Sequence, residues 1–272
     1  MPILHAIVLG ITQGLSEFLP ISSSGHLRLV PWLFGWDDFA GREHLQKTFD
    51  VALHLGTLIG ALAYFWSDVV RYTKAGLRRG ALSTLDGRIA WFLLASTVPA
   101  AITGALFADV IEEKTGYIWL IATMLIVFGL VLAWADRAPG IRKVEQITLR
   151  DALVMGVGQA VALQPGVSRS GVTMTAGRLV GLGRDGAARF AFLMSLPITA
   201  GALVYKAADV ATEGGIPSDF VAPFIWGIVA SGITGWLAVW GTLKLIRTRT
   251  FTPFVVYRIL AGLFFLALYF IR

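Results

Sequence analysis

The feature that most constrains this chain is a series of long apolar segments. The 272 residues are 56% hydrophobic and 15% charged, which leaves too little polar surface to cover a soluble globule. A helix needs about 20 mostly apolar residues to cross a bilayer, whereas barrel strands alternate in polarity, and these segments do not alternate. The sequence therefore predicts an all-α polytopic membrane protein with six transmembrane helices, over residues 49–66, 89–107, 117–135, 190–205, 221–240 and 254–271.

Two further apolar segments, residues 2–36 and 151–182, are interrupted near their middles by Pro20 and Pro165 and by small polar residues. Proline ends or kinks a helix, so these segments predict two re-entrant helical hairpins. No Lys or Arg precedes the first apolar stretch, and we therefore expect it to be retained rather than cleaved as a signal peptide. The absence of cysteine excludes thiol catalysis and disulfides.

The charged residues between the predicted spans alternate in sign along the chain. The loop with Arg78 and Arg79 is basic, the loop with Glu112 is acidic, and the loop with Arg142 and Lys143 is basic again. Because Lys and Arg accumulate in short cytoplasmic loops, the basic loops are predicted to be inside and the acidic loop outside. Both termini are then predicted to be outside.

The two interrupted segments resemble each other. At a shift of 146 residues (168 − 22), Gly10, Gln13, Ser22, Ser24, Gly25, Leu33 and Gly35 align without a gap on Gly156, Gln159, Ser168, Ser170, Gly171, Leu179 and Gly181. Three predicted spans separate the copies, so the first hairpin enters from outside and the second from inside. The sequence predicts one membrane domain, residues 1–272, with inverted-repeat halves at approximately 1–145 and 146–272 and with hairpin tips that meet inside the membrane.

The polar residues of the first hairpin gather around its interruption. Gln13 and Glu17 are four residues apart and share one helix face, and His26 follows the break. Hydroxyls at the start of the second half-helix can cap free N–H groups, and the positive end of the helix dipole there favours an anion. These hydroxyls belong to Ser22, Ser23 and Ser24.

The second hairpin repeats this arrangement with a guanidinium, Arg169, in place of the acid and the histidine. Its hydroxyls belong to Ser168, Ser170 and Thr173. Together the two breaks predict a site that binds an oxyanion beside an acid and a base. Each residue also has a simpler structural interpretation. The serines would only cap helices, and Glu17 and Arg169 would form a buried ion pair. Gly10 and Gly14 would allow close helix packing, and His54 would donate a hydrogen bond between helices.

Three motifs resemble one family of bacterial membrane enzymes, the undecaprenyl-diphosphatase or bacitracin-resistance family. They are "QGLSEFLPISSSGHL", "FDVALHLGTLIG" and "LQPGVSRSGVT", and the resemblance extends over nearly the whole chain. It implies hydrolysis of undecaprenyl diphosphate to undecaprenyl phosphate and inorganic phosphate, which recycles the lipid carrier for peptidoglycan and other envelope polymers and gives bacitracin resistance. It also implies the bacterial inner membrane and a polyprenyl diphosphate lipid substrate.

The resemblance assigns catalytic roles to Glu17, Ser23, His26 and Arg169, and phosphate binding to Ser22, Ser24, Ser168, Ser170 and Thr173. The family uses a divalent cation, Mg²⁺ or Ca²⁺, and its first motif begins with Glu or Gln. This chain has Gln13 there, so Glu17 and Gln13 as metal ligands would supply one carboxylate fewer. Three nucleophiles remain open: Ser23, His26 and metal-bound water. We expect Ser23 to attack, with His26 as its proton partner.

A transporter or flippase of a polyprenyl phosphate lipid is the alternative function, because secondary transporters also use inverted repeats with broken helices. The acid and the histidine beside the anion site favour hydrolysis, since transport of a phosphate group does not need them. Membrane lipids are expected partners, nucleic acid is not, and a homodimer is left open. Since the first hairpin holds Glu17 and His26, we expect the site to open to the periplasmic side.

Overall fold

The computed structural model describes residues 1–212 and 215–272, except for the side chains of residues 108–110, 112–115 and 207–212. These ranges contain helices and no β-strand, apart from an isolated bridge between Arg142 and Leu182. The all-α class is therefore confirmed. In chain order the elements are α1 (Ile3–Phe18), α2 (Ser23–Phe34), α3 (Glu43–Tyr64), α4 (Trp66–Gly76), the short 3₁₀ helix η1 (Ala81–Ser83), α5 (Leu85–Ala95), α6 (Val98–Thr115), α7 (Ile118–Asp136), η2 (Val144–Gln146), α8 (Leu149–Val161), α9 (Arg169–Leu179), α10 (Arg184–Thr212), α11 (Ser218–Ile246) and α12 (Thr252–Ile271).

Five helical stretches in the described ranges are long and apolar enough to cross a membrane, and a sixth is formed if α3 and α4 count as one span. The five are Leu85–Phe107, α7, Arg184–Lys206, α11 and α12, which confirms a multi-pass membrane protein. The predicted span at residues 49–66 differs, because α3 ends at Tyr64 and α4 leaves it at an angle of 82°. Phe65, at φ −93° and ψ 16°, departs from helical geometry and makes this bend.

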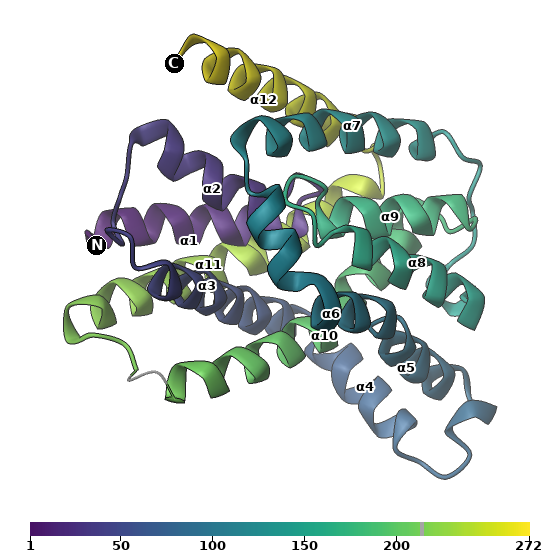
Figure 1. Ribbon diagram of the computed structural model, residues 1–272. Coiled ribbons are helices and arrows are strands. Elements are labelled where there is room, and N and C mark those ends of the chain that lie inside the picture. The colour runs from purple at the N-terminus through teal and green to yellow at the C-terminus, as the bar shows by residue number, and fades with distance from the viewer. Residues whose placement is uncertain (213–214) are drawn as a thin grey trace.

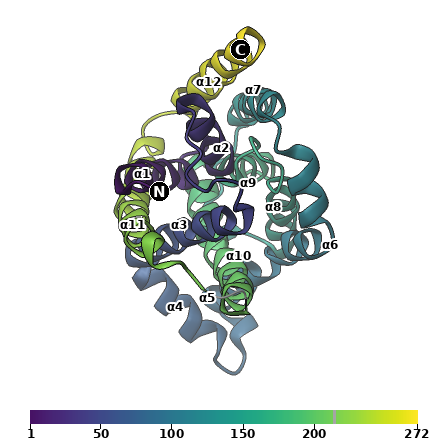
Figure 2. The same cartoon turned by 60° about the vertical axis from the view of Figure 1, so that its left-hand side comes forward.

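The long helix α10 is the most enclosed of the candidate spans. Half of its most apolar window is buried, against 22% to 33% in the other four. It packs against α9 and α3. Elsewhere in the bundle, α1 packs beside α11 and α7 beside α12 (Figures 1 and 2). The two chain termini lie at one end of the bundle, and the connection from α7 to α8 lies at the other end (Figure 1). Side chains of the predicted acidic positions 109, 112, 113, 209 and 213 lie outside the described residues.

Glycines allow α1 to approach α11 closely, as the sequence predicted for Gly10 and Gly14. A Cβ atom added to Gly10 would lie 2.5 Å from the carbonyl oxygen of Gly227, and one added to Gly14 would lie 2.6 Å from that of Ser231. Such distances are too short for any side chain. Lipid tails are as apolar as helix surfaces, so close backbone packing of this kind contributes much of the association between membrane helices.

We predict that Gly10→Ala lowers the melting temperature of the purified protein in detergent, because the new methyl group must push α1 away from α11. Overpacking of this kind costs about 1–3 kcal/mol. The matched control is Gly241→Ala in α11, where an added Cβ meets nothing within 4 Å. The control should melt at the wild-type temperature or slightly above it. Equal melting temperatures for both variants would contradict the close packing of α1 on α11.

Candidate active site

Two helix breaks, between α1 and α2 and between α8 and α9, share an unusual backbone geometry. Ser22 caps α2 with φ 78° and Ser168 caps α9 with φ 76°, which is a left-handed conformation that costs a non-glycine residue free energy. Each serine hydroxyl accepts a hydrogen bond from the backbone N–H three residues later, Gly25 at 3.4 Å and Gly171 at 3.1 Å. These two serines are the pair that the shift of 146 residues aligned.

The two breaks also bind each other directly. The backbone N–H of Gly166 donates to the hydroxyl of Ser22 at 3.1 Å, and the hydroxyl of Ser170 donates to the carbonyl of Leu19 at 3.1 Å. Hydrogen bonds therefore join residues that are 144 and 151 positions apart in the sequence. As a result the first turns of α2 and α9, each with unbonded N–H groups, lie close together.

The carboxylate of Glu17 is the centre of the polar cluster between these breaks. It is 7% exposed and forms an ion pair with Arg169, whose Nη2 donates to Oε1. Its other oxygen, Oε2, accepts from Ser23 Oγ at 2.5 Å and from Gln13 Nε2 at 3.1 Å, and it lies 3.6 Å from His54 Nε2. The structure thus brings three predicted site residues, Gln13, Ser23 and Arg169, to the carboxylate of a fourth, Glu17.

Arg169 is held between this carboxylate and α10. Its Nη1 donates to Thr199 Oγ1 at 2.9 Å. The buried ion pair that the sequence left as a simpler reading is therefore present. Pairing makes both charges tolerable at membrane depth, and it aims the guanidinium at the break where α2 begins.

His26 has a different set of partners from the one expected. Its Nδ1 lies 2.7 Å from the carbonyl oxygen of Ser22, and its Nε2 lies 2.7 Å from the hydroxyl of Tyr257. A carbonyl only accepts, so Nδ1 carries a hydrogen, and Nε2 of a neutral ring then accepts from Tyr257. In this structure His26 has no hydrogen bond to Ser23. The Ser23 hydroxyl donates to the carboxylate of Glu17 instead.

Most of the hydroxyls predicted to bind phosphate already have protein partners. Ser22 and Ser168 act as helix caps, Ser170 donates to the Leu19 carbonyl, and Thr173 donates to the Arg169 carbonyl at 2.7 Å. Ser24 is exposed on the first turn of α2 and has no hydrogen-bond partner among the described residues. Phosphate binding by these five hydroxyls stays a prediction, and Ser24 is the one whose hydroxyl is already available.

The predicted metal ligands offer a small set of donors. Gln13 is fully buried, and its Oε1 has no hydrogen-bond partner in the part of the chain that the structure describes. Nε2 faces Glu17, and reversing the amide would place two oxygens against each other. The described residues contain no group of three or more His, Cys, Asp or Glu side chains arranged for a metal. One carboxylate and one unpaired amide oxygen fit a cation such as Mg²⁺ that substrate phosphates hold in large part.

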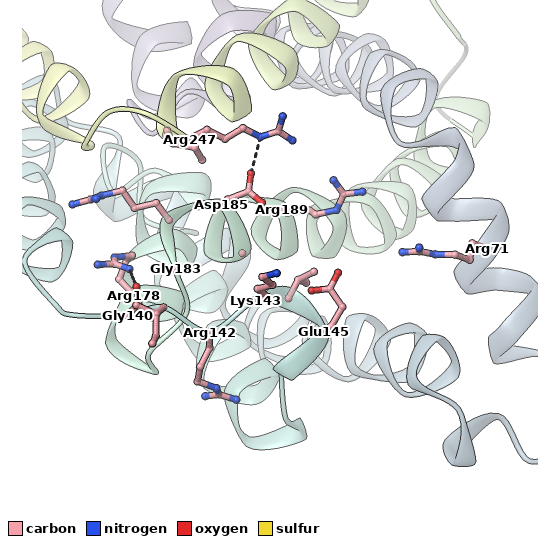
Figure 3. Close-up of a pocket in the computed structure, with 15 residues that line it drawn as sticks. Arg71, Gly140, Arg142, Lys143, Glu145, Arg178, Gly183, Asp185, Arg189 and Arg247 are labelled. Atoms are coloured by element: carbon pink, nitrogen blue, oxygen red, sulfur yellow. Dashed lines mark hydrogen bonds and ion pairs between the residues drawn. The ribbon is translucent and has the colours of Figure 1, made fainter.

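A charged cavity of about 600 Å³ lies apart from this cluster, at the end of the bundle where α7 leads into α8 (Figure 3). Arg71, Lys143 and Arg189 approach it from three segments. Its arginines are matched by carboxylates: Asp68 pairs with Arg71 and Arg189, Asp136 with Arg178 and Arg184, and Asp185 with Arg247. A network of ion pairs therefore surrounds this cavity at the basic end of the protein.

Four residues at or near the site were not predicted to belong to it: His54, Thr199, Tyr257 and Arg258. His54 was noted only as a donor between helices, although a histidine inside an apolar span is itself a signal of function. The same signal applies to Arg258, an arginine within the predicted span at residues 254–271. Nothing in the sequence distinguishes Thr199 from other threonines in apolar helices.

Comparisons with known proteins show the family of this chain. The sequence model of the family described as "Bacitracin resistance protein BacA" matches residues 6–264. A protein named undecaprenyl-diphosphatase from Pelotomaculum thermopropionicum is 47% identical over 264 residues, which cover 97% of this chain and 95% of that protein. Proteins of the same name from Geobacter sulfurreducens and Moorella thermoacetica are 47% and 44% identical over the full length of both chains. This chain therefore belongs to the bacitracin resistance protein BacA family.

Proposed function

We propose that this protein hydrolyses undecaprenyl diphosphate to undecaprenyl phosphate and inorganic phosphate, and so recycles the lipid carrier and gives bacitracin resistance. The observation that carries the proposal is the 2.5 Å hydrogen bond from Ser23 to Glu17, beside Arg169 and at the start of a helix. A hydroxyl that can act as a nucleophile, a carboxylate that can act as a base, and a guanidinium that can bind phosphate oxygens lie together there, which supports the proposal. The full-length relatives named undecaprenyl-diphosphatase support the same reaction.

We propose Ser23 as the nucleophile, with Glu17 as its base. The Ser23 oxygen forms a bond to the terminal phosphorus as the bond from that phosphorus to the bridging oxygen breaks, and undecaprenyl phosphate leaves. The proton of Ser23 passes to Glu17 Oε2, which already accepts its hydrogen bond. Water then attacks the phosphorus of the phosphoserine, and the bond from that phosphorus to Ser23 Oγ breaks. Glu17 returns its proton to Ser23 Oγ, and phosphate leaves with the protons of the attacking water. His26 is a less suitable nucleophile, because both of its ring nitrogens are hydrogen-bonded.

Arg169 binds the phosphate oxygens in this proposal. A planar guanidinium can donate two parallel hydrogen bonds to a phosphoryl group, and the free N–H groups at the starts of α2 and α9 add further donors. Before substrate binds, the same guanidinium neutralises Glu17. Binding of the diphosphate would draw Arg169 toward the phosphate, and Glu17 would then be a stronger base because it loses its counter-charge.

We propose that Glu17 and Gln13 also hold a divalent cation, Mg²⁺ or Ca²⁺, together with the substrate phosphates. The unpaired Gln13 Oε1 supports this proposal. When bound, the cation neutralises charge on the diphosphate. A hydrogen bond between Gln13 and Glu17 keeps the two side chains together on one face of α1.

We propose that α1–α2 and α8–α9 are the two re-entrant hairpins of an inverted repeat, with halves at about 1–145 and 146–272. The matched left-handed caps at Ser22 and Ser168 support the repeat. We further propose that the protein lies in the inner membrane, with both termini outside and the site open to the periplasm. The termini share one end of the bundle, and the basic cavity lies at the opposite end, as the positive-inside rule requires (Figures 1 and 3).

Two neighbouring serines test the nucleophile. Ser23→Ala should lose nearly all phosphate release from undecaprenyl diphosphate, because the attacking oxygen and its contact with Glu17 are gone. The matched control, Ser24→Ala, removes one of several donors and should lose about 10- to 1000-fold at most. Both proteins should melt normally in detergent. A folded Ser23→Ala enzyme with near wild-type activity would exclude Ser23 and leave metal-bound water or His26.

Arg169→Lys should lose most activity although the charge is kept. An ammonium group cannot reproduce the parallel pair of hydrogen bonds, nor contact Glu17 and Thr199 at the same time as a guanidinium does. Phosphate release is the measurement, and Arg247→Lys, an exposed arginine that pairs with Asp185, is the control. Full activity of a folded Arg169→Lys enzyme would reduce Arg169 to a simple counter-charge.

The proposed orientation is tested by cysteine labelling, since the chain has no cysteine of its own. An impermeant thiol reagent should label Glu43→Cys, at the first residue of α3, in intact cells. It should label Arg79→Cys, in the turn after α4, only after the cells are made permeable. The reverse pattern would invert the protein in the membrane.

A further inference from the structure

Arg258, in the second turn of α12, is fully buried, and within the described residues its guanidinium donates only to backbone carbonyls. Among the described residues no carboxylate pairs with it. Its donors reach α7 and both helix breaks: Leu125 at 3.0 Å and Met124 at 3.3 Å, Pro20 at 3.1 Å, and Gly166 and Val167 at 2.9 and 3.0 Å. One side chain therefore binds both breaks at once.

The number and geometry of the hydrogen bonds to these carbonyls explain why an arginine is present. A broken helix leaves carbonyl groups without partners, and each one costs free energy when it is buried away from water. A guanidinium has five N–H donors in a fixed fork, whereas an ammonium has three donors on a single nitrogen. Arg258 thus satisfies carbonyls of both breaks, and its rigid plane sets the distance between Pro20 and Gly166.

The preceding residue, Tyr257, contacts the other side of the site. Its hydroxyl lies 2.7 Å from His26 Nε2, and the two rings stack with centroids 5.7 Å apart. The opposite ring nitrogen of His26 binds the carbonyl of Ser22, the residue that caps α2. Successive residues of a helix point about 100° apart, so α12 reaches both the histidine and the breaks from one turn.

We propose that Tyr257 and Arg258 are positioning residues for phosphoryl transfer, and this inference rests on the proposed function. Tyr257 holds His26 as the neutral tautomer with hydrogen on Nδ1, and His26 in turn fixes the Ser22 carbonyl at the start of α2. Arg258 fixes the spacing of the two breaks. Together they keep Ser23 of the first break in reach of Glu17, and Arg169 of the second break opposite them. Neither residue touches the substrate.

The tautomer is tested without any measurement of activity. In ¹⁵N-histidine-labelled protein in detergent, the His26 signals are identified by their loss in His26→Gln. We expect hydrogen on Nδ1 and a bare, hydrogen-bonded Nε2 at neutral pH. Tyr257→Phe should shift the Nε2 signal, while Tyr269→Phe, the same change on the same helix, should not. A charged ring, hydrogen on Nε2, or an unchanged spectrum in Tyr257→Phe would overturn the role of Tyr257.

The spacing of the breaks is tested by kinetics. Arg258→Lys should lower kcat about 100-fold with little change in KM, because displacement of catalytic groups by about 1 Å has an effect of that size. The control is Arg272→Lys, since Arg272 also donates to carbonyls, those of Trp32 and Leu33, but is exposed. A folded Arg258→Lys enzyme with wild-type kcat would overturn the role of Arg258.

The outcomes separate this inference from the proposed function. Tyr257→Phe keeps the ring and should fold, and it should lower kcat more than Tyr269→Phe does. If Arg258→Lys does not fold, these two tyrosine variants decide whether α12 positions the site, and equal kcat values in them would overturn the inference. If the wild-type protein releases no phosphate from undecaprenyl diphosphate, the proposed function fails, whereas the ¹⁵N spectra still report on the His26 contact.

Discussion

The rest of the structure depends on how two broken helices satisfy their backbone groups within a membrane protein. A break exposes N–H and C=O groups that no water is available to bind inside a bilayer. Here the hydroxyls of the serine caps accept hydrogen bonds from backbone N–H groups, including that of Gly166. The guanidinium of Arg258 donates to carbonyls of both breaks. The N–H groups at the first turns of α2 and α9 remain as donors for an outside ligand, and such donors suit an anion.

The same constraint determines the state of the charges before substrate arrives. An unpaired carboxylate or guanidinium at membrane depth is costly, and so Glu17 and Arg169 neutralise each other across the two breaks. In the proposed reaction, a phosphate that enters would take Arg169 from Glu17 in part. The ion pair is therefore compatible with a catalytic role, because exchange of its partner couples binding of the anion to exposure of the base.

The sequence predicted those parts of the site that depend on local spacing. Gln13 and Glu17 share a helix face because they are four residues apart, and the structure has them hydrogen-bonded. The breaks and their caps follow from Pro20, Pro165 and the serines beside them. Contacts of α12 could not be predicted in this way, since Arg258 and Pro20 are 238 residues apart and no local pattern encodes their pairing. The bend at Phe65 was missed for a similar reason, because neither proline nor glycine marks it.

The run of three serines shows how backbone geometry separates residues that are alike in sequence. The left-handed conformation of Ser22 turns the chain so that its hydroxyl points back to the second break, where it accepts from Gly166. Ser23 then begins the helix and points toward Glu17, whereas Ser24, a further 100° around the helix, is exposed. One buried cap, one hydroxyl bonded to a base and one accessible hydroxyl thus arise from identical side chains. The left-handed residue at Ser22 lies where the chain turns from α1 into α2, immediately before the serine that contacts the carboxylate of α1.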